Sequence, residues 1–445
     1  MRRSLLTSLL PVLLAACGTA ETQVETATVD DNAFLDGEAN AGKSDTAWQS
    51  SLDAQEVEVD IEGDVQASSS DLERAPLSVA QFALTYLRKN SNVYLQSLAE
   101  DYAHGTEQIE WLYQGNFSKW SQVPSQNRSK LTHFRMRAVS AVILHPGDSS
   151  KLNGKRYSPI VPKRPGTLWG DIAADCGEQE GSIEPSQDVY WYVWTPEKPS
   201  CRADLKQTIQ VTVSKVLPKG PVTYPEYDRL ISDKKIDVLV LFGQVDHGTL
   251  RSSDYAFTAI QSLESSLKKA KFKKIFAPLG LRYQRTKASI VETIDIYSPN
   301  EFSGLGDWTH FSNFDEGINS HELIVYNGHS MLGASDFWAR KSIYQDPNKY
   351  QIFLYNGCLG YEYYVNPILE GKKGWQNVDI VSNVIETPFS IMVRETATTV
   401  AMILSGAERG GKTSWQAILA SENQIAAGDS FYGASGVRTN FFMPH

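Results

Sequence analysis

Two short segments of the chain repeat one pattern, and each ends in a side chain that can do chemistry. Residues 323–329 read LIVYNGH and residues 352–358 read IFLYNGC, so an apolar run and Tyr-Asn-Gly lead to His329 and to Cys358. A thiol attacks a carbonyl carbon as its thiolate, and a neighbouring imidazole can take its proton and return it to the leaving amine. The pair predicts a Cys-His dyad, with the backbone N–H groups of Ser330 and Cys358 as donors to the oxyanion. Either residue alone would instead predict a loop cap or an inert core thiol.

The pattern of apolar residues predicts the elements that carry this pair. Apolar runs typical of buried strands alternate with amphipathic segments, which indicates an α/β domain with a mainly parallel sheet covered by helices. We expect strands at residues 236–242, 289–297, 323–326, 351–355 and 378–384, and helices from Asp254 and over 335–344 and 389–404. Parallel strands end at one edge of a sheet, so His329 and Cys358 are expected side by side there if their strands are neighbours. The glycine before each is expected to leave space for an incoming chain.

A smaller α+β domain is predicted before this part, over residues 77–220. Helical spacing of apolar residues begins at Ser78 and continues to about Gly115, and strand-like runs follow at residues 134–144, 188–194 and 208–216. The proline-rich segment 217–225 fits neither a helix nor a central strand. It marks the boundary to the α/β domain, residues 226–445.

The first residues have the features of an export signal. Two arginines precede an apolar run at residues 5–14, which is too short to span a bilayer, and small residues then lead to Cys17. The sequence Leu-Ala-Ala-Cys that ends here resembles the bacterial lipobox, which implies removal of residues 1–16 and attachment of diacylglycerol to the Cys17 sulfur. An ordinary signal peptide cut nearby is the alternative. We expect an exported lipoprotein anchored to a bacterial lipid bilayer, at the outer membrane or the cell surface.

Negative charge is concentrated in one segment. The chain carries 42 Lys and Arg against 52 Asp and Glu, and residues 18–75 alone hold 15 acidic and 2 basic residues. Because this segment has few large apolar residues to offset its ordering entropy, we expect residues 17–76 to form an acidic, disordered tether. The net charge of −10 argues against a nucleic-acid partner bound by phosphate neutralisation.

The four cysteines are accounted for under oxidising, exported conditions. Cys17 is assigned to lipid, and Cys176 and Cys201 flank a strand-like stretch that a disulfide would close. Two reduced, buried thiols are the alternative for that pair. Cys358 is then left over, which suits a thiol that is either buried or used in chemistry.

The order of motifs over residues 235–445 resembles a known family. An apolar strand, a His with an adjoining Gly, a helix, a second apolar strand and Gly-Cys resemble the core of the caspase-like cysteine peptidases, which include caspases, metacaspases, legumains, clostripain and gingipains. The resemblance implies a caspase-like fold with His329 and Cys358 as the catalytic dyad, and hydrolysis of peptide bonds in a protein or peptide substrate. The chain departs from the family in two places. Ser330 stands where Gly usually follows the histidine, and Gly357 replaces the usual Ala, Ser or Asp.

The resemblance also implies where a substrate would bind. Residues 243–248 follow the first strand of the α/β domain, and such folds set substrate preference partly at that position. Asp246 there is expected to pair with an Arg or Lys just before the scissile bond, with His247 beside it. The alternative is that Asp246 caps the following loop and His247 is a surface residue.

Some sequence features are also compatible with other kinds of site and function. Residues 406–413 read GAERGGKT and match the phosphate-binding loop, but a glycine-rich turn between two helices fits the flanking patterns better. His310, His321 and His329 lie close in sequence without the spacing of a zinc site, so we expect no metal and no cofactor. A caspase-like surface module that binds without catalysis is the competing function, and Ser330 is the residue that favours it.

Overall fold

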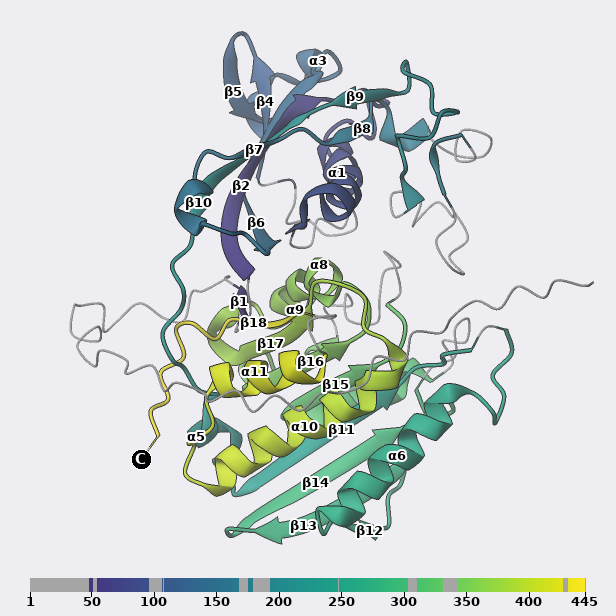
Figure 1. Ribbon diagram of the computed structural model, residues 1–445, viewed down its shortest axis with the longest axis vertical. Coiled ribbons are helices and arrows are strands. Elements are labelled where there is room, and N and C mark those ends of the chain that lie inside the picture. Colours follow the sequence, from purple (N-terminus) through teal and green to yellow (C-terminus); the bar gives the residue numbers. More distant parts are fainter. Residues whose placement is uncertain are drawn as a thin grey trace, which may run out of the picture. The chain divides into compact units, whose positions relative to one another are not determined.

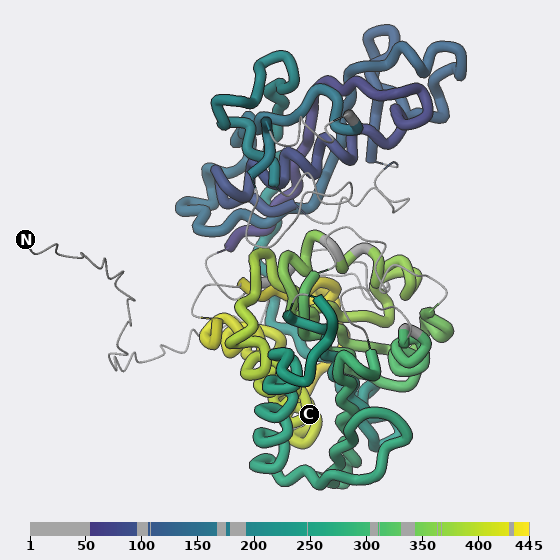
Figure 2. The backbone as a smooth tube through the Cα atoms, turned by 90° about the vertical axis from the view of Figure 1, so that its right-hand side faces the viewer, coloured from purple at the N-terminus to yellow at the C-terminus, as the bar shows by residue number. Residues whose placement is uncertain are grey.

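The computed structural model describes residues 48–50, 54–95, 106, 108–167, 175–178, 193–246, 248–302, 310–330, 343–426 and 431–444. These residues all fall within one compact unit, Gly42–His445. After the first short strand, which belongs to the second sheet, the chain forms the whole of a first sheet and then returns to the second. The colours of Figure 2 follow this order, with the purple and blue segments gathered apart from the green and yellow ones. The described part is therefore a mixed α/β protein with two principal sheets.

The first sheet has seven strands, and all its pairings are antiparallel. The strand order is β5-β4-β6-β2-β10-β7, and β3 also pairs with β6. The strands are β2 (Ala54–Asp64), β3 (Val93–Leu95), β4 (Ile109–Tyr113), β5 (Asn116–Lys119), β6 (His133–Leu144), β7 (Arg156–Tyr157) and β10 (Gln210–Val216). Helix α1 (Ala75–Ser91), the short α3 (Ser125–Arg128) and the two-stranded sheet of β8 (Ile160–Pro162) and β9 (Lys206–Thr208) accompany it. The strands predicted at 134–144 and 208–216 are thus confirmed, whereas most of the one predicted at 188–194 lies outside the described residues.

The end of the predicted tether is folded. Strand β1 (Trp48–Ser50) pairs with the second sheet, and β2 pairs with both β6 and β10 in the first. Val57, Val59 and Ile61 on β2 are fully buried, while the acidic residues between them are partly exposed. The expectation of disorder up to residue 76 is therefore wrong for residues 48–50 and from Ala54 onward. Composition averaged over a long acidic segment hides a strand that alternates apolar and acidic residues.

The predicted helical stretch also ends earlier than expected. Helix α1 stops at Ser91, and Asn92 adopts the left-handed conformation with φ of 53°. β3 and β4 then follow within the region predicted to be helical to about Gly115. Burial of short apolar runs against β6 outweighs their helical spacing.

Cys176 and Cys201 form a disulfide, with their Cα atoms 4.6 Å apart. Both cysteines are buried. This confirms the predicted pairing, and the crosslink closes a loop across 25 residues of sequence.

The second sheet has nine strands in the order β1-β18-β17-β16-β15-β11-β14-β13-β12 (Figure 1). The strands after β1 are β11 (Lys235–Phe242), β12 (Lys273–Ile275), β13 (Leu281–Lys287), β14 (Ile290–Tyr297), β15 (Leu323–Asn327), β16 (Gln351–Asn356), β17 (Val378–Asn383) and β18 (Tyr432–Ser435). The five central strands are parallel to one another, in the order β17-β16-β15-β11-β14. The outer pairings on both sides are antiparallel. All five predicted strands are confirmed, but the sheet as a whole is mixed rather than mainly parallel.

Helices cover both faces of this sheet. Alternate residues of β11 belong to two hydrophobic clusters, as expected for a strand buried on both sides. One cluster includes α6 (Tyr255–Lys269), α10 (Phe389–Glu408) and α11 (Trp415–Ile425), and the other includes α7 (Phe311–Ser320), α8 (Gly360–Tyr363) and α9 (Val365–Gly371). The short α5 (Tyr227–Leu230) precedes β11. The helices predicted from Asp254 and over 389–404 are confirmed, whereas most of the one predicted at 335–344 lies outside the described residues.

Candidate active site

His329 and Cys358 follow the ends of two neighbouring parallel strands. β15 and β16 pair in register, with Tyr326 opposite Tyr355 and Asn327 opposite Asn356. Each of the two residues comes two positions after its asparagine, so both lie at the carboxyl edge of the same sheet. Adjacent strands lie about 4.8 Å apart. The condition on which the dyad depends, that the two strands are neighbours, is therefore met.

The repeated Tyr-Asn-Gly pattern is built as a matched layer beneath this edge. The rings of Tyr326 and Tyr355 stack with centroids 5.1 Å apart, and Asn356 Nδ2 donates to Asn327 Oδ1 at 3.2 Å. A Cβ placed on Gly328 would lie 2.5 Å from the Tyr326 hydroxyl. One placed on Gly357 would lie 2.5 Å from the Tyr355 ring. The space that the glycines leave is thus filled by the tyrosines of the same motif, and not held open for an incoming chain as the sequence suggested.

Three hydroxyl groups hold the backbone at the two strand ends. Tyr326 Oη donates to the His329 carbonyl at 2.7 Å, and Tyr355 Oη donates to Ser330 Oγ at 3.3 Å. Ser330 Oγ in turn donates to the carbonyl oxygen of Cys358. The residue after the histidine is therefore tied to the cysteine itself.

The contacts of the His329 ring define which nitrogen can act as a base. Nε2 lies 2.9 Å from the carbonyl oxygen of Val245, and the Phe389 ring packs edge-on against the imidazole at 4.9 Å between centroids. A carbonyl oxygen only accepts hydrogen bonds, so Nε2 carries the proton. In the neutral ring Nδ1 is then the nitrogen with a lone pair, and it can accept a proton from a thiol.

The Cys358 thiol is mostly buried and protonated at neutral pH. Burial, and next the carboxylate of Glu386, raise the pKa of the thiol to about 11. The backbone N–H of Thr387 and the Arg88 guanidinium oppose this rise in pKa. Arg88 Nη1 also pairs with Glu386 Oε1 at 3.2 Å. The thiol needs a base in order to become a nucleophile, because a pKa this high leaves little thiolate.

Asn383, at the end of β17, fixes the turn that carries Cys358. Its Nδ2 donates to the Gly357 carbonyl at 2.5 Å and to the Ile385 carbonyl at 2.6 Å. Its Oδ1 accepts the Gly360 N–H at 3.1 Å. The amide is buried, so all three bonds act where water cannot replace them.

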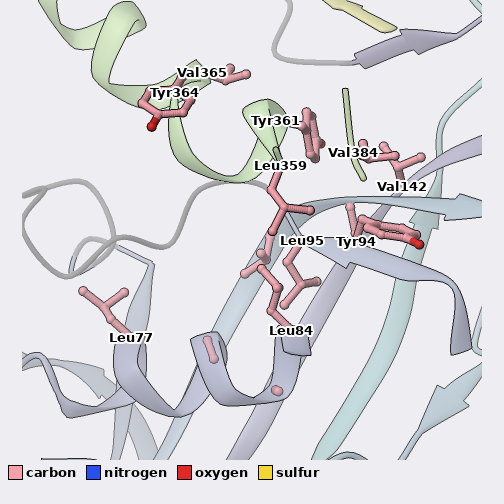
Figure 3. Close-up of a cluster of buried hydrophobic side chains, with 14 of the residues drawn as sticks. Leu77, Leu84, Tyr94, Leu95, Val142, Leu359, Tyr361, Tyr364, Val365 and Val384 are labelled. Atoms are coloured by element: carbon pink, nitrogen blue, oxygen red, sulfur yellow. The ribbon is translucent and has the colours of Figure 1, made fainter. Parts of the chain in front are cut away.

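The residues after Cys358 enter the hydrophobic core. Leu359 adopts a left-handed conformation with φ of 55° and starts α8. Its side chain belongs to a cluster that also includes Leu84 and Leu95 of the first sheet region (Figure 3). Glu362 on α8 is fully buried without a hydrogen bond to the described residues, and burial raises its pKa well above the usual range. The cysteine therefore stands at the rim of a core.

The backbone N–H groups of Ser330 and Cys358 are the expected oxyanion donors. Neither the Ser330 N–H nor the Cys358 N–H donates a hydrogen bond to another described residue. Both groups lie at the carboxyl edge of the sheet. Backbone N–H groups at such a position can donate hydrogen bonds to a developing oxyanion.

The loop after β11 is held by Asp254. This buried carboxylate caps α6 through the Ala256 N–H at 2.9 Å and accepts the Asp246 N–H at 2.8 Å. Asp246 is exposed at the sheet edge that also carries His329, whose Nε2 contacts the neighbouring Val245. His247 lies outside the described residues.

The glycine-rich segment 406–413 begins in the last turn of α10 and continues as the link to α11. α10 runs to Glu408, and the positive φ angles of Gly410 and Gly411 reverse the chain before α11. A phosphate-binding loop requires a strand before the glycines, and here there is a helix. The structure thus agrees with the helix-to-helix interpretation.

His321 is a structural residue. Its Nδ1 lies 2.7 Å from the Gly317 carbonyl and its Nε2 lies 3.0 Å from Asp295, which also binds Arg282 through both oxygens. Within the described ranges no group of three His, Cys, Asp or Glu side chains is arranged to hold a metal ion.

Cys17 lies outside the described residues, so its predicted lipidation stays a prediction. In the part of the chain that the structure describes, no helix is both long enough and apolar enough to cross a bilayer.

The chain matches no protein-family model, no curated protein and no solved structure. The geometry of the site is therefore the basis on which its function is inferred.

Several residues of the site were not identified from the sequence. Asn327, Asn356 and Asn383 were present in or beside the predicted strands, and the repetition of Asn in both motifs was the one signal that could have found two of them. Arg88 and Glu386 carry no such signal, because they are distant in sequence and meet only in the fold.

Proposed function

We propose that the protein is a cysteine peptidase of the caspase-like kind, with His329 and Cys358 as its catalytic dyad. The observation that carries the proposal is the register of β15 and β16, which brings the two residues to matched positions at one sheet edge. The N–H groups of Ser330 and Cys358, which donate to no described residue, support it, because acyl transfer needs donors for the oxyanion.

The proposed reaction starts from a neutral pair. His329 Nδ1 takes the proton of the Cys358 thiol as Sγ attacks the carbonyl carbon of the peptide bond. The negative charge moves to the carbonyl oxygen, where the two backbone N–H groups bind it. The C–N bond then breaks, the imidazolium gives its proton to the leaving amine, and a thioester remains on Cys358. Water, deprotonated by His329, hydrolyses the thioester and restores the thiol.

A preference for substrates with Arg or Lys before the scissile bond belongs to the same proposal. Asp246 is exposed on the loop that also provides the Val245 carbonyl contact to His329. An exposed carboxylate on this loop can pair with a basic side chain of the substrate. Export and anchoring of the enzyme through lipid on Cys17 complete the proposal.

A non-catalytic binding module is the second candidate function. The observation that favours it is the burial of the Cys358 thiol, which raises its pKa to about 11. A thiol that stays protonated and packed at the rim of the core would be inert.

The test is covalent labelling with an acyloxymethyl ketone that carries a peptide ending in Arg. The peptidase proposal predicts modification of Cys358, found by mass spectrometry, in the unaltered protein and loss of labelling in His329→Ala. His133→Ala, which changes a partly exposed histidine of the first sheet, serves as the matched control and should label normally. Unmodified Cys358, or equal labelling in His329→Ala, would favour the binding module. A matched probe ending in Ala, and labelling of Asp246→Asn, separate the substrate preference from the chemistry.

A further inference from the structure

Five lysines and two apolar side chains are exposed together at one edge of the second sheet. Within residues 268–274 the exposed lysines form almost a continuous run, and Ile275 and Phe276 follow directly. We call this set the lysine surface, which consists of Lys268, Lys269, Lys271, Lys273, Lys274, Ile275 and Phe276.

The local fold explains why these side chains point to solvent. α6 ends at Lys269, and Lys271 reverses the chain with φ of 69°. Phe272 alone turns inward, where the Arg285 guanidinium lies 4.3 Å from its ring centroid. β12 then forms the last strand of the sheet, beside α6 in Figure 1. Its outer edge pairs with no other described strand.

Most of the positive charge on this surface is uncompensated. Lys274 pairs with Glu264 at 3.3 Å, whereas the other four lysines form no ion pair with a described residue. Five lysines and one glutamate give residues 264–276 a net charge of +4, although the whole chain has a net charge of −10. The surface is therefore a local positive patch on an acidic protein, suited to an anionic partner.

The apolar residues distinguish this surface from ordinary protection of a sheet edge. Lysines on an edge strand prevent pairing with other sheets, but this protective role does not explain why apolar side chains are exposed beside them. Phe276 is 87% exposed and Ile275 is 40% exposed. An aromatic side chain among lysines is the composition that binds a bilayer surface, where the amines meet lipid phosphates and the ring enters the headgroup region.

We propose that the lysine surface docks the folded part of the protein on an anionic lipid bilayer. This inference does not depend on the peptidase proposal, because His329, Cys358 and their contacts play no part in it. It adds a second, reversible contact with lipid, which would orient the sheet relative to the membrane.

The experiment is vesicle sedimentation of the full chain carrying Cys17→Ser, which cannot be acylated at that sulfur. All variants share residues 1–17, so differences between them report on the lysine surface. We expect binding to phosphatidylcholine vesicles that contain phosphatidylglycerol, weakened by salt, and little binding without the anionic lipid. Replacing Lys268, Lys269, Lys271 and Lys273 by Gln should weaken binding at least about tenfold. Phe276→Ser should weaken it by about tenfold.

A variant with an equal loss of charge is the control, with Gln in place of Lys130, Lys151, Lys155 and Lys219, which are exposed elsewhere. It should bind vesicles nearly as well as the parent protein. Equal loss in the control would overturn the proposal, because net charge alone would then explain binding. Unchanged vesicle binding in the quadruple variant would also overturn it. If that variant lost binding to polyglutamate but kept its binding to vesicles, the surface would be assigned to an acidic protein partner. Self-association without a change in vesicle binding would assign the lysines to edge protection.

Discussion

The hydroxyl of Ser330 donates a hydrogen bond to the carbonyl oxygen of Cys358, so the two strand ends that carry the dyad are joined directly. The family that the sequence resembles usually has Gly at this position, and the serine was the main departure from it. In the fold, Ser330 is buried between the Tyr355 hydroxyl and the cysteine carbonyl. The serine that replaces the usual glycine therefore joins the two strand ends by hydrogen bonds.

Ser330→Ala tests this tie. Removing the hydroxyl leaves the Cys358 carbonyl unpaired, so we expect a loss of about 1 kcal/mol in the free energy of unfolding. A displaced cysteine should also lower kcat/KM for peptide substrates by about tenfold. Ser214→Ala, which removes a hydroxyl bond to the Glu58 carbonyl on the first sheet, is the control. Equal activity of the two variants would show that the tie does not position the thiol.

Asn383→Ala tests the support of the turn. The variant leaves two carbonyl groups and one N–H buried without their partner, and we expect a loss of about 3 kcal/mol in the free energy of unfolding. Urea denaturation measures this loss. Asn90→Ala, which removes one exposed bond to the Tyr86 carbonyl, should cost much less. Similar values for the two variants would contradict the role given to Asn383.

The thiol environment predicts how Cys358 reacts with iodoacetamide. Because the pKa of the thiol is about 11, the alkylation rate should rise about tenfold per pH unit between pH 7 and pH 10. Glu386→Gln removes a negative charge that raises this pKa and should speed alkylation at pH 8. Glu178→Gln changes an exposed glutamate of the other sheet region and should have no effect. A rate that is already level above pH 7 would mean that the resting cysteine is a thiolate.

Glu395 predicts a pH dependence of stability. Burial raises its pKa from about 4.5 to about 7, although Tyr432 donates to it at 2.9 Å. The native state keeps this proton where the unfolded chain has lost it, so the stabilisation is fully present below about pH 4.5 and is lost as the pH rises to about 7. The loss is on the order of 3 kcal/mol. In Glu395→Gln this part of the pH dependence should disappear, as measured by urea denaturation at pH 4.5 and pH 7.5. A constant difference between variant and parent would contradict it.

The sequence predicted the centre of the fold better than its edges. β11, β14, β15, β16 and β17 are continuous apolar runs because both of their faces are buried, and such runs are visible in a single sequence. The antiparallel edges, β12, β13 and β18, are short or partly polar, and they were not predicted. Pairing between distant segments, such as β1 with β18, leaves no local signal.

In the site, too, some features could be predicted from the sequence and others could not. The matched motifs predicted that His329 and Cys358 share a sheet edge, because strand register follows from two similar apolar runs. The role of the glycines was predicted wrongly, since the rings that occupy the space beside them depend on tertiary packing. The raised pKa of the thiol was equally hidden, because its main cause is burial, which only the fold produces. Glu386 and Arg88, which also act on this pKa, are distant from Cys358 in sequence.

The most direct test of the account is to trap the thioester on Cys358. A peptide ester ending in Arg is mixed with the protein, and the reaction is quenched with acid within its first turnover. The protein is then digested, and the mass of the fragment that contains Cys358 is measured by mass spectrometry. The account predicts the added mass of the acyl group on Cys358 in the parent protein and its absence in His329→Ala. Substrate cleavage without acylated Cys358, or no cleavage and no acylation across esters and peptides of varied sequence, would contradict it.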